Sequence, residues 1–172
     1  MSRSWLKNIT KVYNQLLELN SLNEFQRTAS LKGVFNRDIT NNANFSFRRK
    51  KLNPTPAEGQ DTMERLFRHL TTVITDKETN KREYDPSRSV RLHWLRYHLE
   101  EKKQTNMYVF SVEEPEGVRT YIWDKDEEYV IVLEPLRNKD EYYLLTAYHI
   151  EGKDKARNKM SKKWRRRLMD LK

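Results

Sequence analysis

Apolar residues in the first half of the chain recur every three or four positions, the spacing that places side chains on one face of a helix. This pattern predicts three helices, over residues 5–19, 22–36 and 61–75. Asp61 followed by Glu64 has the capping-box pattern and marks the start of the third helix. Residues 37–60 are rich in Asn, Pro and basic residues, and residues 76–84 are polar, so we expect connections at both places.

The pattern changes after about residue 104, where short segments rich in Val, Ile, Tyr and Trp alternate with polar turns. The segments are MYVFSV, VRTYIW, EYVIVLE and EYYLLTAYHI. They have the composition and spacing of antiparallel strands joined by hairpins. The chain is therefore predicted to be α+β, with N-terminal helices followed by a four-stranded antiparallel sheet and a basic C-terminal helix. We divide it into residues 1–84, a helical region that braces the sheet, residues 85–152, a helix with the sheet, and residues 153–172, the basic helix.

The segment DPSRSVRLHWLRYHLEE, residues 85–101, is predicted to form one helix, capped by Asp85 with Pro86 in its first turn. At about 100° per residue, its apolar side chains fall on two opposite sides. The two groups are Leu92, Leu95 and Leu99 on one side, and Val90, Trp94 and Tyr97 on the other. Arg91 and His98 align with each other in the gap between the two groups.

A cation between apolar walls is unfavourable unless it is paired. One interpretation is that Arg91 and His98 bind carboxylates such as Glu134, or backbone carbonyls. The other is an anion pocket, in which an imidazole beside a guanidinium binds phosphate and moves a proton near neutral pH. His93 and His69 are expected to be ordinary surface histidines.

The last predicted strand presents different side chains on its two faces, because successive residues of a strand point in opposite directions. One face holds Tyr142, Leu144, Thr146, Tyr148 and Ile150, and the other holds Tyr143, Leu145, Ala147 and His149. One face must meet the helices, and the other is a partly open platform ending in Thr146 and Tyr148 or in His149. Aromatic platforms beside cations suit RNA bases and phosphates. Alternatively, the tyrosines are present for their strand propensity, with hydroxyls at the rim.

The positive charge is concentrated at one end of the chain. The protein carries a net charge of +9, and residues 153–172 hold ten Lys or Arg and two Asp, so this segment carries +8 of it. Such a cluster favours a polyanion, nucleic acid first and an acidic membrane surface second. The cations expected to contact nucleic acid are Lys162, Lys163, Arg165, Arg166 and Arg167. An apolar stripe on the same segment is expected to dock on the body, through Ala156, Met160, Trp164, Leu168 and Leu171.

Several classes of protein are excluded or disfavoured by the sequence. There is no Cys, which excludes disulfides and Cys-ligated metal sites. Walker, GxGxxG, HExxH and GxSxG motifs are absent, and we expect neither a metal nor a cofactor. No apolar run has the length of a transmembrane helix or the form of a signal peptide, so a cytoplasmic protein is expected.

The segment SRSVRLHWLRYHLEE, followed by a sheet that ends YVIVLEPLRNKDEYYLLTAYHI, resembles the phage-associated branch of the barnase–EndoU–colicin–RelE-like (BECR) nucleases. The resemblance covers residues 85–150 and makes this region the expected nuclease core. It implies a toxin-like or phage-related endoribonuclease without a metal, in which the 2′-hydroxyl of RNA attacks the neighbouring phosphate and leaves a 2′,3′-cyclic phosphate.

The resemblance also implies roles for individual residues. Arg88 and Arg91 would hold the phosphate, His98 or His149 would move protons, Thr146 and Tyr148 would orient the substrate, and Glu134 is an optional base. RNA is then the expected partner, together with an antitoxin or immunity protein. A complete catalytic triad does not align, so a non-catalytic nucleic-acid-binding protein remains an alternative. A protein-interaction adaptor or inhibitor that uses the basic helix is another.

Overall fold

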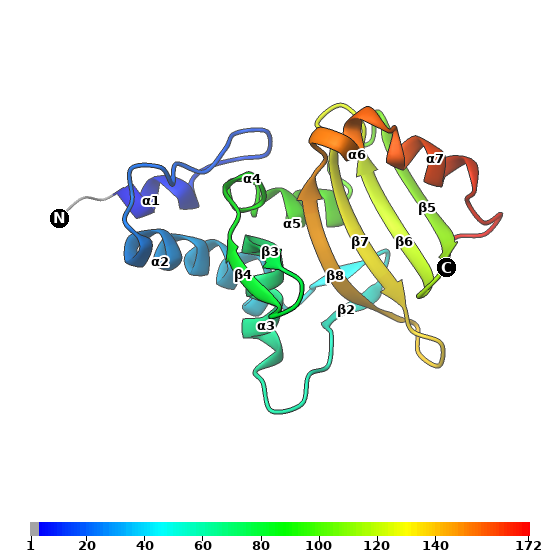
Figure 1. Ribbon diagram of the computed structural model, residues 1–172, viewed down its shortest axis with the longest axis horizontal. Helices are drawn as coiled ribbons and strands as arrows, with labels where there is room; N and C mark the ends of the chain where they lie inside the picture. The colour runs from blue at the N-terminus through cyan, green and yellow to red at the C-terminus, as the bar shows by residue number, and fades with distance from the viewer. Residues whose placement is uncertain (1–3) are drawn as a thin grey trace.

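The structure is a computed structural model that describes residues 4–172. Helices dominate the N-terminal part, and a curled sheet of six strands follows, with two short helices at the C-terminal end (Figure 1). The predicted α+β class is therefore confirmed, but the sheet is larger than predicted and mixed rather than purely antiparallel. In the described residues, no helix is long and apolar enough to cross a membrane.

The helix predicted over residues 5–19 is much shorter. Helix α1 spans Ser4–Ile9, and the chain then turns back on itself. The Asn8 side chain fixes this turn, because it accepts a hydrogen bond from Glu18 N at 2.7 Å and donates to Glu18 O at 3.1 Å. Leu17, which the helical pattern had assigned to α1, is instead buried from an irregular segment. Helix α2, Glu24–Phe35, agrees with the prediction and continues into a short π-helix, Asn36–Thr40.

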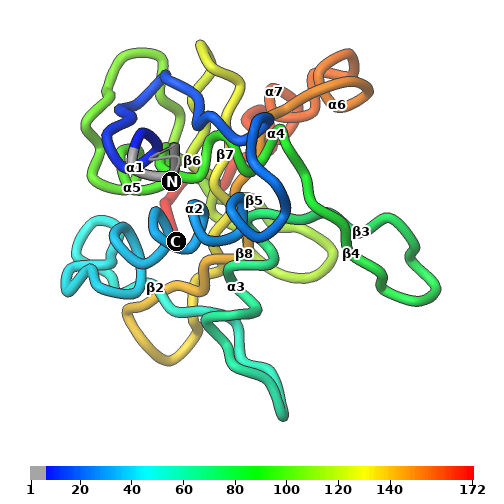
Figure 2. The backbone as a smooth tube through the Cα atoms, turned by 90° about the vertical axis from the view of Figure 1, so that its left-hand side faces the viewer, coloured from blue at the N-terminus to red at the C-terminus, as the bar shows by residue number. Residues whose placement is uncertain are grey.

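Helix α3, Thr62–Thr71, begins at the predicted cap but ends early. The Asp61 side chain accepts from Met63 N at 2.9 Å and from Glu64 N at 3.2 Å. After Thr71 the chain forms a hairpin of β3, Thr72–Asp76, and β4, Lys81–Tyr84, where a helix end and a polar connection were expected. The run TVIT after the helix explains the change, because β-branched residues favour strands. Figure 2 shows this hairpin projecting from the body of the molecule.

The helix predicted over residues 85–101 is broken into α4, Pro86–Ser89, and α5, Trp94–Leu99. The break occurs where the irregular N-terminal segment packs, because the carbonyl of Val90 accepts from Leu17 N at 2.9 Å instead of continuing the helical ladder. Leu92, Trp94 and Leu99 are all buried after the break. Because the helix is interrupted at this point, residues from both apolar sides of the predicted helix, such as Leu92 and Trp94, are buried in the same core.

The four predicted strands form the antiparallel part of the sheet. They are β5, Met107–Glu114, β6, Gly117–Asp124, β7, Tyr129–Pro135, and β8, Glu141–His149. Two further strands extend it to the order β1-β2-β8-β7-β6-β5, with β1 at Ser46–Phe47 and β2 at Lys50–Pro54. Strand β2 runs parallel to β8. It was not predicted because RRKKLNP lacks an apolar alternation, and Leu52 is its one buried residue.

Each face of the sheet has its own apolar cluster. The helices α2 to α5 and the irregular N-terminal segment cover one face, and α1 packs on α2 (Figure 1). On the other face lie α6, Gly152–Ala156, and α7, Lys159–Arg165. Met160 is 3% exposed, and the Trp164 ring meets Phe110 edge to face at 5.2 Å. The predicted docking of the basic segment is confirmed for these two residues, whereas Leu168 and Leu171 lie beyond the end of α7.

Candidate phosphate-binding cleft

Arg91 and His98, the pair expected to form an open anion pocket, do not share one. His98 is 1% exposed, with Nδ1 2.7 Å from Trp94 O and Nε2 2.8 Å from Asp124 Oδ2. Arg91 donates through Nη1 to Ser87 O at 2.6 Å and lies 5.3 Å from the centre of the Trp94 ring. For His98, therefore, the structure agrees with the interpretation of an internally paired cation, with Asp124 rather than Glu134 as the carboxylate.

Asp124 is the centre of a buried polar network rather than of an accessible site. Besides His98, its carboxylate accepts from Tyr13 Oη at 2.5 Å and from Lys103 Nζ at 2.5 Å. Burial acts to raise the pKa of Asp124, but hydrogen bonds from His98 and Lys103 outweigh it and hold this pKa well below its usual range. The network joins the N-terminal segment, α5 and β6, and its role is structural. His93, expected on the surface, is also buried, with Nε2 3.1 Å from Val12 O.

Three other residues expected from the sequence do converge. Arg88, Thr146 and Tyr148 line an open cleft of about 400 Å³ at the edge of the sheet. The remaining lining residues were not predicted as site residues, and they are His69, Arg82, Asp154 and Lys159. We call this cavity the phosphate cleft. Its walls come from α3, β4, α4, β8, α6 and α7, so six elements meet there.

A bulge in β8 brings Thr146 and Tyr148 to this cleft. Val132 pairs with Thr146, but the next residue, Leu133, pairs with Leu144, so Leu145 is an extra residue in β8. Such a bulge shifts the alternation of side chains by one. Leu144 and Ala147 consequently both join the cluster under the helices, whereas Tyr148 packs with the cluster on the other face. The prediction that Leu144 and Tyr148 share a face is therefore wrong.

Arg88 is the best-ordered cation of the phosphate cleft. Its Nη1 donates to His69 O at 2.7 Å and to Thr146 Oγ1 at 3.1 Å, so it ties α4 to α3 and β8. Its Nε lies 3.6 Å from Asp85 Oδ2, too far for a hydrogen bond, and has no hydrogen-bond partner in the described part of the chain. A buried guanidinium N–H without an acceptor is unfavourable.

Several arginines crowd around the phosphate cleft. Arg82 is fixed by Thr72, to which Nε donates at 2.8 Å and Nη2 at 3.0 Å. Burial lowers the pKa of Arg82, and repulsion from Arg88, Arg68 and Arg65 lowers it further. Among residues 4–172, Arg88 is the one member of this group with a carboxylate within ion-pair distance. The group therefore holds positive charge that an anion would neutralise.

Two titratable groups of the phosphate cleft, His69 and Tyr148, are neutral at pH 7. Burial, followed by repulsion from Arg82 and Arg65, lowers the pKa of His69 from 6.5 to about 4. Its imidazole can therefore accept a proton. Burial, followed by the charge of Asp154, raises the pKa of Tyr148 to about 12, so its hydroxyl is protonated and can donate. A neutral base, His69, and a neutral acid, Tyr148, thus lie in the same cleft as the positively charged arginines.

His149 and Arg91 belong to a separate cluster outside the phosphate cleft. Glu151 connects them, because its Oε1 lies 2.7 Å from His149 Nδ1 and accepts from Ser87 Oγ at 2.5 Å. Ser87 in turn accepts from Arg91 through its backbone oxygen. Both candidates are therefore engaged in local contacts.

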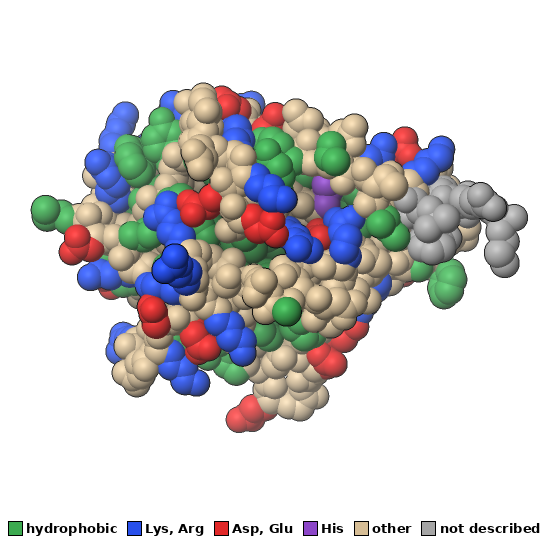
Figure 3. All heavy atoms as spheres, turned by 180° about the vertical axis from the view of Figure 1, so that it is seen from behind, with side chains coloured by type: hydrophobic (Ala, Val, Ile, Leu, Met, Phe, Trp, Pro, Cys, Tyr) green, Lys and Arg blue, Asp and Glu red, His purple; other side chains and the backbone are tan. Residues whose placement is uncertain are grey.

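The cations of α7 do not line the phosphate cleft, apart from Lys159. Lys163 pairs with Glu114, and Arg166 lies 3.7 Å from the same carboxylate. Arg167 stacks over Trp164 at 3.9 Å, while Lys162 and Arg165 are exposed. Figure 3 shows Lys and Arg interspersed with Asp and Glu over the rear face of the molecule. The charge of the tail is thus partly neutralised, and its apolar side faces this chain's own sheet.

No local pattern could have identified His69, Arg82 and Lys159 as neighbours. They stand far apart in the sequence, in α3, in an unpredicted hairpin and at the start of α7. Comparison of the chain with protein-family models, with curated proteins and with solved structures finds no match. The geometry of the phosphate cleft therefore carries the functional argument.

Proposed function

We propose that the phosphate cleft binds the phosphodiester of RNA and that the protein is a metal-independent endoribonuclease. The observation that carries the proposal is that Arg82, Arg88 and Lys159 share one open cleft with His69 and Tyr148. The resemblance of residues 85–150 to BECR nucleases suggests the same chemistry.

Phosphate recognition follows from the arginines. A guanidinium presents a planar set of donors that matches two phosphate oxygens. Arg88 Nε has no hydrogen-bond partner among the described residues, and a phosphate oxygen would provide one. Arg82 is repelled by its arginine neighbours, and the negative charge of a bound phosphate would offset this repulsion. The hydrogen bonds to Thr72 and Thr146 hold both side chains in place before a ligand arrives, which reduces the entropy lost on binding.

The cleavage step uses the two neutral groups. The 2′-oxygen forms a bond to phosphorus as its proton passes to His69, and the bond from phosphorus to the 5′-oxygen breaks. Tyr148 donates its proton to the leaving 5′-oxygen, which gives a 2′,3′-cyclic phosphate and a 5′-hydroxyl. Arg82 and Arg88 stabilise the negative charge that develops on the non-bridging oxygens. The bound phosphate also offsets the charge of Arg82, which raises the pKa of His69 and makes it a stronger base.

Cleavage of RNA in EDTA tests the proposal. The full-length protein should produce fragments with cyclic phosphate ends, and His69→Gln should lower the rate by about 10² to 10⁴. Arg82→Met should lower both binding and cleavage. Arg137→Met, which removes an exposed charge in the β7–β8 turn, should leave both unchanged.

Binding without cleavage would identify the second candidate, a non-catalytic RNA-binding protein. This alternative is favoured by the pKa of His69, about 4, which makes its imidazole a weak base at neutral pH. If neither RNA nor inorganic phosphate binds, both candidates are wrong.

A further inference from the structure

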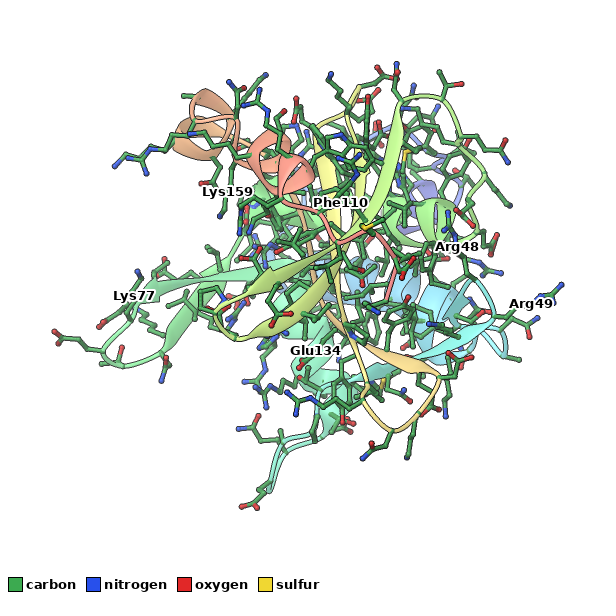
Figure 4. The ribbon with its side chains drawn as sticks, turned by 90° about the vertical axis from the view of Figure 1, so that its right-hand side faces the viewer. Arg48, Arg49, Lys77, Phe110, Glu134 and Lys159 are labelled. Carbon is green, nitrogen blue, oxygen red and sulfur yellow. The ribbon has the colours of Figure 1, made fainter. Side chains whose placement is uncertain are left out.

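A second cavity adjoins the phosphate cleft. It has a volume of about 250 Å³ and lies beside α7, on the sheet face opposite helices α2 to α5. Tyr148 and Lys159 line both cavities, so the two lie next to each other. Figure 4 shows Lys159 on the side of α7 that faces the projecting hairpin, whose tip carries Lys77. We call this second cavity the side cavity.

The side cavity combines apolar and polar walls. Val132, Pro115 and the ring of Tyr148 are apolar, whereas Arg119 contributes a guanidinium held 3.4 Å from Glu134 and bonded to Val118 O at 3.1 Å. The other polar lining residues are Glu116, Lys159 and Glu114, and Glu114 is bound by two more of them, Tyr121 Oη at 2.8 Å and Lys163. None of these residues lines the phosphate cleft except Tyr148 and Lys159.

We propose that the side cavity is the subsite for the nucleobase of the nucleotide next to the bound phosphate. The inference rests on the proposed function and makes single-stranded RNA the substrate class. A flat base can stack on a tyrosine ring or on a guanidinium plane, and the side cavity offers both surfaces. Carboxylate and hydroxyl groups at the wall can bind the hydrogen-bonding edge of the base. A base in a duplex is already stacked and paired, so it cannot enter.

Titration of the unmodified protein separates this inference from the proposed function. Inorganic phosphate, and the 3′- and 5′-monophosphates of the four ribonucleosides, are each added while the His69 ring signals are followed by NMR. Phosphate alone tests the phosphate cleft. At least one nucleotide series should bind about tenfold more tightly than phosphate, the gain expected from one stacked base.

The Arg119→Met variant tests the location of the subsite. It should bind inorganic phosphate as the unmodified protein does and lose the tenfold advantage of the nucleotides, whereas Arg137→Met keeps it. If phosphate shifts the His69 signals but nucleotides bind no more tightly, the side-cavity inference is wrong and the phosphate cleft stands. If phosphate itself does not bind, the proposed function is wrong and this inference fails with it. A tenfold advantage that persists in Arg119→Met would also overturn the inference.

Discussion

At the scale of single residues, His69 links the chemistry of the phosphate cleft to the stability of the protein. The pKa of His69 is about 4 in the folded chain and 6.5, the ordinary value for histidine, in the unfolded chain. The unfolded chain therefore binds more protons between these values, and the fold loses stability as the pH falls. The contribution is fully present above about pH 6.5 and is lost as the pH drops towards 4.

We expect His69→Gln to reduce the acid sensitivity of the fold. Urea unfolding of the variant should show a smaller fall in the free energy of unfolding between pH 7 and pH 4.5 than the unmodified protein shows. Arg137→Met serves as the control and should retain the unmodified pH dependence. Equal slopes in the variant and the unmodified protein would show that His69 titrates normally.

The same scale shows why residue patterns identified some site residues and misassigned others. Thr146 and Tyr148 were predicted from the end of the last strand and Arg88 from the resemblance to BECR nucleases, and the three do line one cleft. His98 was predicted from its alignment with Arg91 on a helix, but it is buried and hydrogen-bonded to a carboxylate from β6. Which carboxylate reaches a helix depends on strand order, and a helical periodicity contains no information on strand order.

At the scale of elements, the attachment of α7 depends on one buried methionine. Met160 is 3% exposed, whereas Met169, nine positions later, is 102% exposed. Met160→Ala leaves a cavity and is expected to lower the free energy of unfolding by about 2 kcal/mol or more. The matched substitution Met169→Ala removes the same atoms from an exposed side chain and should not measurably change the free energy of unfolding.

Hydrogen exchange measures where the loss from Met160→Ala appears. The amides of α7 should exchange faster in this variant than in Met169→Ala, while those of β7 at the centre of the sheet stay protected. Because Lys159 and Tyr148 lie where α7 meets the sheet, phosphate affinity should fall as well. Unchanged exchange in α7 would mean that Trp164 alone holds the helix.

Elements with strong apolar patterns were predictable, and those without were not. The strands β5 to β8 are rich in Val, Ile and Tyr and appear where the pattern placed them. Strand β2 is basic and polar, and it exists because β8 offers it a free edge. The β3–β4 hairpin and the break at Val90 depend on contacts between segments distant in sequence, and the bulge at Leu145 depends on register with β7. Local propensity cannot specify contacts of this kind.

At the scale of the whole molecule, the charge has two locations with different consequences for RNA binding. Residues 153–172 carry most of the net charge but are largely exposed or paired with Glu114. The phosphate cleft holds fewer cations, and two of them, Arg82 and Arg88, are fixed by hydrogen bonds to Thr72, Thr146 and His69 O. The third, Lys159, lies 3.5 Å from Asp154. Mobile surface cations raise affinity for any polyanion, whereas fixed cations select the position of a phosphate.

This division predicts different salt dependences. Binding of single-stranded RNA should weaken with added salt, with a slope of about 0.7 in the logarithm for each phosphate neutralised. Arg82→Met should reduce that slope by about one phosphate and also lower the rate of cleavage. Replacement of Lys162 and Arg165 together by Met should reduce the slope by a comparable or larger amount. The cleaved positions should nevertheless be unchanged, because neither residue lines the phosphate cleft. A tail variant with altered cleavage positions would place substrate selection in α7 rather than in the phosphate cleft, and the arginines of α4 and β4 would then have no part in it.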